Sequence, residues 1–112
     1  MSYFTASLTR EEDEVRAELA RQDAKFGPQN HPDGTALAGD ALGAMSAKRA
    51  CQFAASKNAV TWRDVLWEEV AEAFAEDDPT MLLAELLQVE AVARQWRMAI
   101  RRRLAEQSGE TS

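Results

Sequence analysis

The segment over residues 61–106 constrains the fold most, because its apolar residues follow two helical repeats that meet at a turn. Asp78 and Pro79 mark that turn. An aspartate suits the position that caps a helix, and a proline suits the first helical position, where its missing N–H costs nothing. We therefore expect one helix over residues 61–76 and another over residues 79–106.

Each of these two expected helices carries a carboxylate inside its apolar face. At about 100° per residue, Glu69 falls about 20° from Trp62, and Glu85 falls about 20° from Trp96. Both tryptophans belong to the apolar stripes of their helices. Two more acids, Glu72 and Glu68, lie on the rim of the first stripe. The pattern therefore predicts acids where a small protein would ordinarily bury apolar side chains.

Two interpretations explain inward acids on neighbouring antiparallel helices, where an unpaired carboxylate is costly and two of them repel. A divalent cation removes both problems, and Mg²⁺ in particular takes oxygen ligands and is often shared with substrate phosphates. Alternatively, the acids pair with basic residues of another helix. Periodicity leaves both interpretations open. The basic residues available for such pairing are Arg16, Arg21, Lys48, Arg49 and Arg63.

The first half of the chain predicts two more helices. Thr9 and Glu12 have the spacing of a capping box, which predicts a helix from Thr9 to about Lys25. Residues 26–35 hold two prolines and two glycines, and we expect a loop there. A helix from Ala36 or Asp40 to about Lys57 should follow.

Smaller signals refine these boundaries. Asn58 is a plausible left-handed residue after a helix, and Thr61 with Asp64 has the character of a capping box. No segment alternates as a strand does. The predicted fold class is all-α: one small four-helix bundle-type domain over residues 1–112, with flexible ends at 1–8 and 107–112. A chain this short buries only about two-thirds of its unfolded surface, so we expect oligomerisation to complete the bundle.

Charge and cysteine content narrow the function classes. The net charge of −6 argues against nucleic acid and anionic membranes as partners, because both need a basic face. No apolar run approaches the length of a membrane span, and the acidic start is unlike a signal peptide. The single cysteine, Cys51, excludes an internal disulfide and suits a reducing compartment. We therefore expect a cytoplasmic protein.

The acids also form a recognisable motif. Glu69-Val-Ala-Glu72, a gap of twelve residues and Glu85-Leu-Leu-Gln88 resemble the ExxE…ExxD signature of the MazG-like all-α nucleoside triphosphate pyrophosphohydrolases. Glu68, directly before the first acid, resembles the EExxE form of that signature. The likeness covers residues 61–97 well. It extends more weakly to the stretch ARQDAKFGPQNHPDG upstream.

The resemblance implies a helical bundle that forms a homodimer or a dimer of dimers. It implies Mg²⁺, with Mn²⁺ as an alternative, held by the acids around a nucleoside triphosphate. A metal-activated water would attack phosphorus and release a nucleoside monophosphate and pyrophosphate. Carried over residue by residue, Glu69 and Glu72 become catalytic residues and metal ligands. The remaining candidate metal ligands are Glu85, Gln88 and Glu68.

Gln88 departs from the family signature, which has aspartate at that position. An amide oxygen can ligate a hard cation, but it brings no charge and cannot act as a base. The sequence therefore leaves the enzyme assignment open. The alternative is a non-catalytic helical scaffold or partner-binding protein derived from the same fold.

Basic residues should also meet the phosphates of such a substrate. The sequence does not choose among the candidates. For the run at residues 101–103, the simpler interpretation is a favourable interaction with the dipole at the end of the last helix. His31 either contacts the nucleotide or is an exposed loop residue. The candidate substrate-binding residues are Lys48, Arg49, Arg94, Arg97 and His31.

Overall fold

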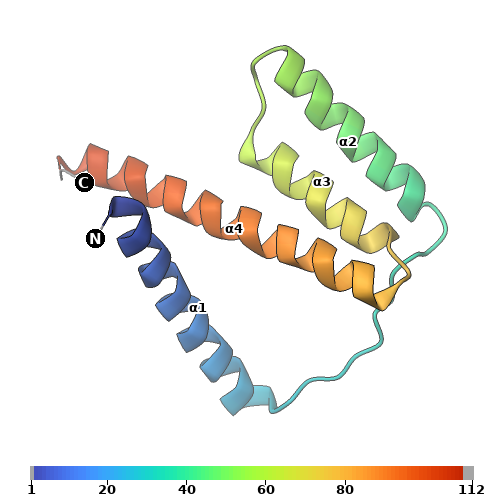
Figure 1. Cartoon of the computed structure of the whole chain (residues 1–112), viewed down its shortest axis with the longest axis horizontal. Coiled ribbons are helices and arrows are strands. Elements are labelled where there is room, and N and C mark those ends of the chain that lie inside the picture. The colour runs from blue at the N-terminus through green and yellow to red at the C-terminus, as the bar shows by residue number, and fades with distance from the viewer. Residues whose placement is uncertain (1, 110–112) are drawn as a thin grey trace. The chain divides into compact units, whose positions relative to one another are not determined.

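The computed structural model describes residues 2–109, which form four helices and no strand (Figure 1). The all-α prediction is confirmed. The helices are α1 (Tyr3–Phe26), α2 (Asp40–Ser56), α3 (Trp62–Ala75) and α4 (Pro79–Gln107). Contacts divide the chain into two compact units. One holds the chain up to Pro32 together with the chain from Arg94 onward, and the other is Asp33–Ala93.

Local capping explains where α3 and α4 begin. The Thr61 hydroxyl accepts the Asp64 N–H at 3.2 Å, and the Asp64 carboxylate accepts the Thr61 N–H at 3.0 Å, which completes a capping box. The Asp78 carboxylate accepts the Thr80 N–H at 2.9 Å. Asn58 has φ of 53° after α2. These predicted boundaries are confirmed.

The predicted start of α1 at Thr9 is wrong. The helix begins at Tyr3, because the Ser2 hydroxyl caps it by accepting the Thr5 N–H at 3.1 Å. Thr9 lies inside the helix and its hydroxyl donates to the Thr5 carbonyl at 3.0 Å. Residues 3–8, expected to be flexible, are therefore helical. At the other end α4 continues to Gln107, and residues 110–112 lie outside the described part of the chain.

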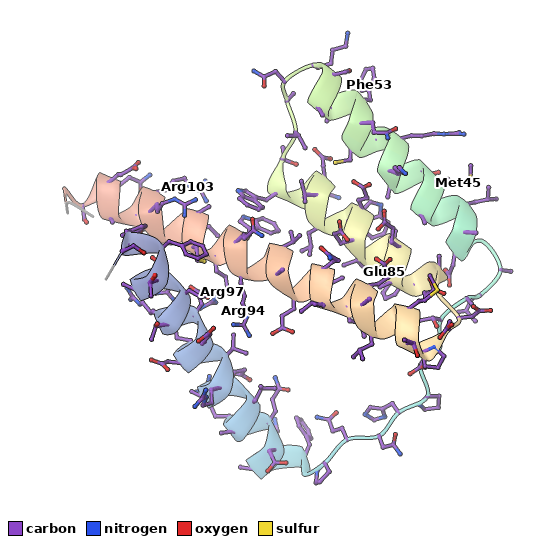
Figure 2. The ribbon with its side chains drawn as sticks, viewed as in Figure 1. Met45, Phe53, Glu85, Arg94, Arg97 and Arg103 are labelled. Atoms are coloured by element: carbon purple, nitrogen blue, oxygen red, sulfur yellow. The ribbon has the colours of Figure 1, made fainter. Side chains whose placement is uncertain are left out.

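In the unit Asp33–Ala93, α3 lies between α2 and the first half of α4 (Figure 1). Its fully buried apolar residues are few, and most of them are small: Ala47, Ala71, Ala73 and Leu82. Phe74 on α3 and Leu86 on α4 are 53% and 48% exposed. Three helices side by side form a single layer, and a single layer cannot cover both of its faces. Figure 2 shows Met45 and Phe53 on the side of α2 that faces away from α3.

The other unit pairs α1 with the last half of α4. Met98 is buried there, but Leu104 is 58% exposed. The only buried residue of α1 is a carboxylate, Glu11. No helix within residues 2–109 has an apolar stretch of the length and hydropathy that crossing a bilayer requires.

Candidate metal centre

Three carboxylates converge inside the unit Asp33–Ala93. One oxygen from each of Glu69, Glu72 and Glu85 lies within 4.8 Å of the other two, and all three residues are half-buried. Glu69 and Glu72 are three residues apart on α3, so their side chains project from the same side of that helix. Glu85 comes from α4 (Figure 2). The structure thus brings together the three acids that the motif singled out.

The acids oppose one another's ionisation. Burial raises the pKa of Glu69, and the negative charges of Glu68 and Glu85 raise it further. Burial also raises the pKa of Glu72, and Glu69, Glu85 and Glu68 add to that shift. Lys48 on α2 is the one recorded charge that acts against it. A site with these shifts prefers a bound proton or a bound cation to three bare charges.

The negative charges of these three acids are not neutralised by ion pairs with basic side chains of the described residues. Within residues 2–109, none of the three carboxylates has an ion pair or a hydrogen bond with an arginine or lysine. Arg21, one of the residues considered for such pairing, binds Glu18 instead at 2.5 Å. Lys48 influences Glu72 through its charge without forming a salt bridge. The interhelical pairing considered from the sequence therefore finds no support in this part of the chain.

The donor set fits a hard divalent cation. Octahedral Mg²⁺ holds oxygens at about 2.1 Å, which places adjacent ligand oxygens about 3.0 Å apart and opposite ones about 4.2 Å apart. Oxygens within 4.8 Å of one another reach that geometry through small side-chain rotations. Carboxylates alone suit Mg²⁺ and Mn²⁺ and do not suit soft metals. Waters and substrate phosphates would fill the remaining positions.

Glu68 and Gln88 are placed differently. Burial raises the pKa of the Cys51 thiol on α2, and the nearby Glu68 carboxylate raises it further. Glu68 also raises the pKa of Glu69 and Glu72, so it borders the cluster. Gln88 is exposed on α4, three residues after Glu85. Helical periodicity could not predict that Glu68 lies near Cys51, because the two residues belong to different helices.

The structure separates the candidate substrate-binding residues. Lys48 has the strongest case, because its charge acts on Glu72. Arg49 is exposed on the same helix. The other three belong to the other compact unit. There His31 is exposed and hydrogen-bonds to Gln29 at 3.2 Å. Those three residues are His31, Arg94 and Arg97.

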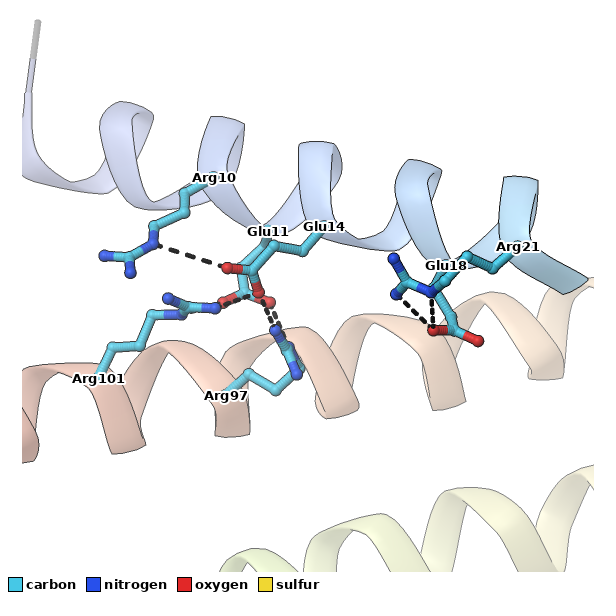
Figure 3. A network of polar contacts seen from close by, with 7 residues as sticks. All are labelled: Arg10, Glu11, Glu14, Glu18, Arg21, Arg97 and Arg101. Carbon is cyan, nitrogen blue, oxygen red and sulfur yellow. Dashed lines mark hydrogen bonds and ion pairs between the residues drawn. The ribbon is translucent and has the colours of Figure 1, made fainter.

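A second polar cluster joins α1 to α4, and we call it the charge clamp. It consists of Glu11 and Glu14 on α1 and of Arg97 and Arg101 on α4 (Figure 3). Glu11 is completely buried. Its burial opposes ionisation, but the hydrogen bonds and charges of Arg97 and Arg101 outweigh that effect and lower the pKa of Glu11. Sequence reasoning missed this cluster, although its spacings of three and four residues were visible.

Comparisons of the chain with protein-family models, with curated proteins and with solved structures found no match. The resemblance to the MazG-like family therefore rests on the motif residues themselves.

Proposed function

We propose that this protein is a Mg²⁺-dependent nucleoside triphosphate pyrophosphohydrolase that releases pyrophosphate and a nucleoside monophosphate. The observation that carries the proposal is the convergence of Glu69, Glu72 and Glu85 without an ion pair or hydrogen bond to a basic side chain among the described residues. Unpaired, half-buried acids with raised pKa values are a common mark of a functional site. The motif resemblance supplies the reaction.

Each residue has a distinct task in this proposal. The carboxylates of Glu69, Glu72 and Glu85 would hold Mg²⁺, which supplies charge neutralisation of the triphosphate and a lower pKa for its bound water. Glu72 or Glu69 would also accept a proton from the attacking water, and a raised pKa makes either a better base. Lys48 would bind the phosphates from α2. Its position near Glu72 favours it over the other basic candidates.

The same site supports a second function through Gln88. Glutamine in place of the family's aspartate removes one negative charge from the ligand set, which weakens the hold on a divalent cation. A protein that had lost turnover in this way would act as a helical scaffold or bind a partner. We place this alternative second, because three of the motif's acids remain and face one another.

We also propose that the chain forms a homodimer or homotetramer. One layer of three helices leaves large apolar side chains uncovered, and their burial would contribute about 25 cal/mol per Å². Trp67 is 55% exposed. It lies two residues before Glu69, so it projects about 160° away from that acid, which favours an interface over stacking on a ligand at the cluster. The other uncovered residues include Leu42, Met45, Phe53, Leu83 and Leu87.

Pyrophosphate release tests the enzymatic function. Purified protein is incubated with Mg²⁺ and each of several ribo- and deoxyribonucleoside triphosphates, and free pyrophosphate is measured. We expect release from at least one triphosphate, and we expect Glu69→Gln to abolish it. Glu12→Gln is the matched control, because Glu12 is an exposed acid on α1 outside the cluster.

If no triphosphate in the panel releases pyrophosphate, the response of the melting temperature to metal decides between the remaining explanations. If the wild-type melting temperature also fails to respond to Mg²⁺ or Mn²⁺, the cluster binds no cation and the hydrolase proposal is wrong. If the metal raises the melting temperature without turnover, the cluster is a metal site in a non-catalytic protein.

A further inference from the structure

The charge clamp joins α1 to α4 through four ion pairs. The Arg97 guanidinium donates to Glu11 at 2.5 Å through Nε, and the Arg101 Nε donates to the other Glu11 oxygen at 2.7 Å. Both arginines also donate to Glu14 through Nη2. Each arginine therefore bridges two acids, and each acid bridges two arginines. Such closed networks fix register strongly, because one displaced helix leaves several charges unpaired.

Apolar burial contributes little to holding α1. Its sole buried residue is Glu11. Several of its large apolar side chains face solvent: Tyr3, Phe4, Leu19 and Phe26 are 40–63% exposed. The four charges of the clamp therefore hold the most buried part of α1. Nothing in those contacts requires both helices to belong to the same chain.

The connection after α1 is long enough to let the helix dock elsewhere. The Ala36 N–H donates to the Phe74 carbonyl at 2.7 Å, which ties the chain to the unit Asp33–Ala93 from that point on. Residues 28–35 lie between this tie and the end of α1, and they hold no helix. Among the described residues, no backbone N–H from 28 to 35 donates to another backbone carbonyl. Eight extended residues span up to roughly 28 Å.

We propose that α1 is an exchangeable arm, and that in the homo-oligomer the α1 of one copy closes the charge clamp on α4 of another copy. The proposal rests on the homo-oligomer inferred above and names the segment that links its chains. Every contact of the clamp is kept in the exchange, so the two arrangements differ mainly in which chain supplies α1. The clamp then selects a second copy of this chain by charge pattern, since acids three residues apart must meet arginines four residues apart.

Charge reversal in two separate variants tests the exchange. An acid-reversed variant carries Glu11→Lys and Glu14→Lys, and a base-reversed variant carries Arg97→Glu and Arg101→Glu. Neither can close a clamp on itself or on its own copies, because like charges would meet. In a mixture, each α1 meets an α4 of opposite charge only on the other variant. A chain carrying all four changes is the control, because it restores complementary charges within one sequence.

The variants are mixed in urea, refolded together, and weighed by native mass spectrometry with a mass tag on one of them. We expect mixed pairs to exceed the statistical share of about half that two copies of this size give when they associate without preference. We also expect the melting temperature of the mixture to rise by about 4 °C above either variant alone. If a reversed variant does not fold alone, its recovery in the mixture is itself the expected result.

Three outcomes would overturn the exchange. The first is a share of mixed pairs at or below the statistical value, together with full recovery of the melting temperature in the four-change chain. That result would show that each chain closes its own clamp. Pairs that persist equally in each reversed variant would show that copies meet through another surface, which leaves the homo-oligomer standing without the exchange. If the double variants stay unfolded even when mixed, the milder pair Glu14→Lys and Arg101→Glu gives the same comparison, because Glu14 is 41% exposed. Failure of that pair to enrich for mixed pairs is the third such outcome.

Discussion

Replacing Glu69 with glutamine should stabilise the metal-free protein, which is the reverse of what most substitutions do. Glutamine keeps nearly the same size and removes the charge. In the wild type that charge is opposed by burial first and then by Glu68 and Glu85. No basic partner of Glu69 within residues 2–109 is lost by the change.

The geometry sets the size of the effect. Two unit charges 4.8 Å apart repel by about 1 kcal/mol at the dielectric constant of water and by about 3.5 kcal/mol at an effective constant of 20. Glu69 faces Glu72 and Glu85 at or within that distance. Protonation of one acid relieves part of the repulsion in the wild type, so the gain from the substitution is smaller than the sum. We expect about 1–2 kcal/mol at neutral pH, or a rise in melting temperature of about 4–8 °C.

Mg²⁺ should reverse the order of the two melting temperatures, so that the wild type becomes more stable than Glu69→Gln. At a free concentration of 100 times its dissociation constant, a bound ligand adds about 2.7 kcal/mol to the stability of the folded state. The wild type gains this amount, and the variant gains much less because an uncharged amide replaces one of the charged ligands. Thermal unfolding followed by circular dichroism, in a chelator and in a Mg²⁺ series, measures both halves of the prediction. Glu12→Gln, the exposed control, should follow the wild type throughout.

The reasoning fails if Glu69→Gln lowers the melting temperature in chelator as much as an ordinary buried substitution does. That result would mean that the carboxylate makes a stabilising interaction, as a salt bridge would, and that the acids are structural. A gain in chelator with no reversal in Mg²⁺ would confirm the repulsion and contradict the metal centre.

Three further predictions concern the clamp, the pH dependence and the motif. Glu11→Gln should destabilise the protein by about 2 kcal/mol, which is below the usual cost of breaking a buried pair, because Arg97 and Arg101 still reach water. Glu18→Gln, in an exposed pair on the same helix, is the control and should change the melting temperature little. Equal effects of the two substitutions would contradict a specific role for the clamp. As pH falls from neutral, the metal-free protein should first gain stability, because the acids with raised pKa values take up protons more readily when folded. It should lose stability below about 4.5, because Glu11 then takes up a proton in the unfolded chain while its lowered pKa keeps it ionised in the folded protein. A melting temperature that falls steadily over the whole range would refute this. Gln88→Asp should tighten Mg²⁺ binding and raise any pyrophosphate release by restoring the fourth charge of the motif, and calorimetric titration with Mg²⁺ that shows no change would place residue 88 outside the ligand set.

The acid cluster could be predicted from the sequence because helical periodicity is regular. Counting at about 100° per residue placed Glu69 and Glu85 in apolar faces, and a short turn at Asp78 made the two helices neighbours. Those two facts are enough to bring their side chains together. The spacing of Thr61 and Asp64 correctly predicts the capping box at the start of α3, because that interaction spans only four residues.

The features that the sequence did not predict depend on competition between alternative helix starts or on contacts between residues far apart in the chain. Two hydroxyl residues, Ser2 and Thr9, offer a start for α1, and the earlier one wins because it yields a longer helix. Phe74 on α3 stays exposed, because an apolar helix face becomes part of a core only when another layer covers it. The clamp joins residues more than eighty positions apart, a pairing that periodicity within one helix cannot reveal.

Glu11 and Glu69 show why burial alone does not mark a functional acid. Glu11 is the more buried of the two, yet its pKa is lowered, because two guanidiniums outweigh the cost of leaving water. Glu69 is only half-buried, yet its pKa is raised, because its recorded charged neighbours are acids. Folding has already matched the charge of Glu11, and a further ligand there would have to displace an arginine. At Glu69 the matching charge is missing from the described residues, and a bound cation is the simplest way to supply it.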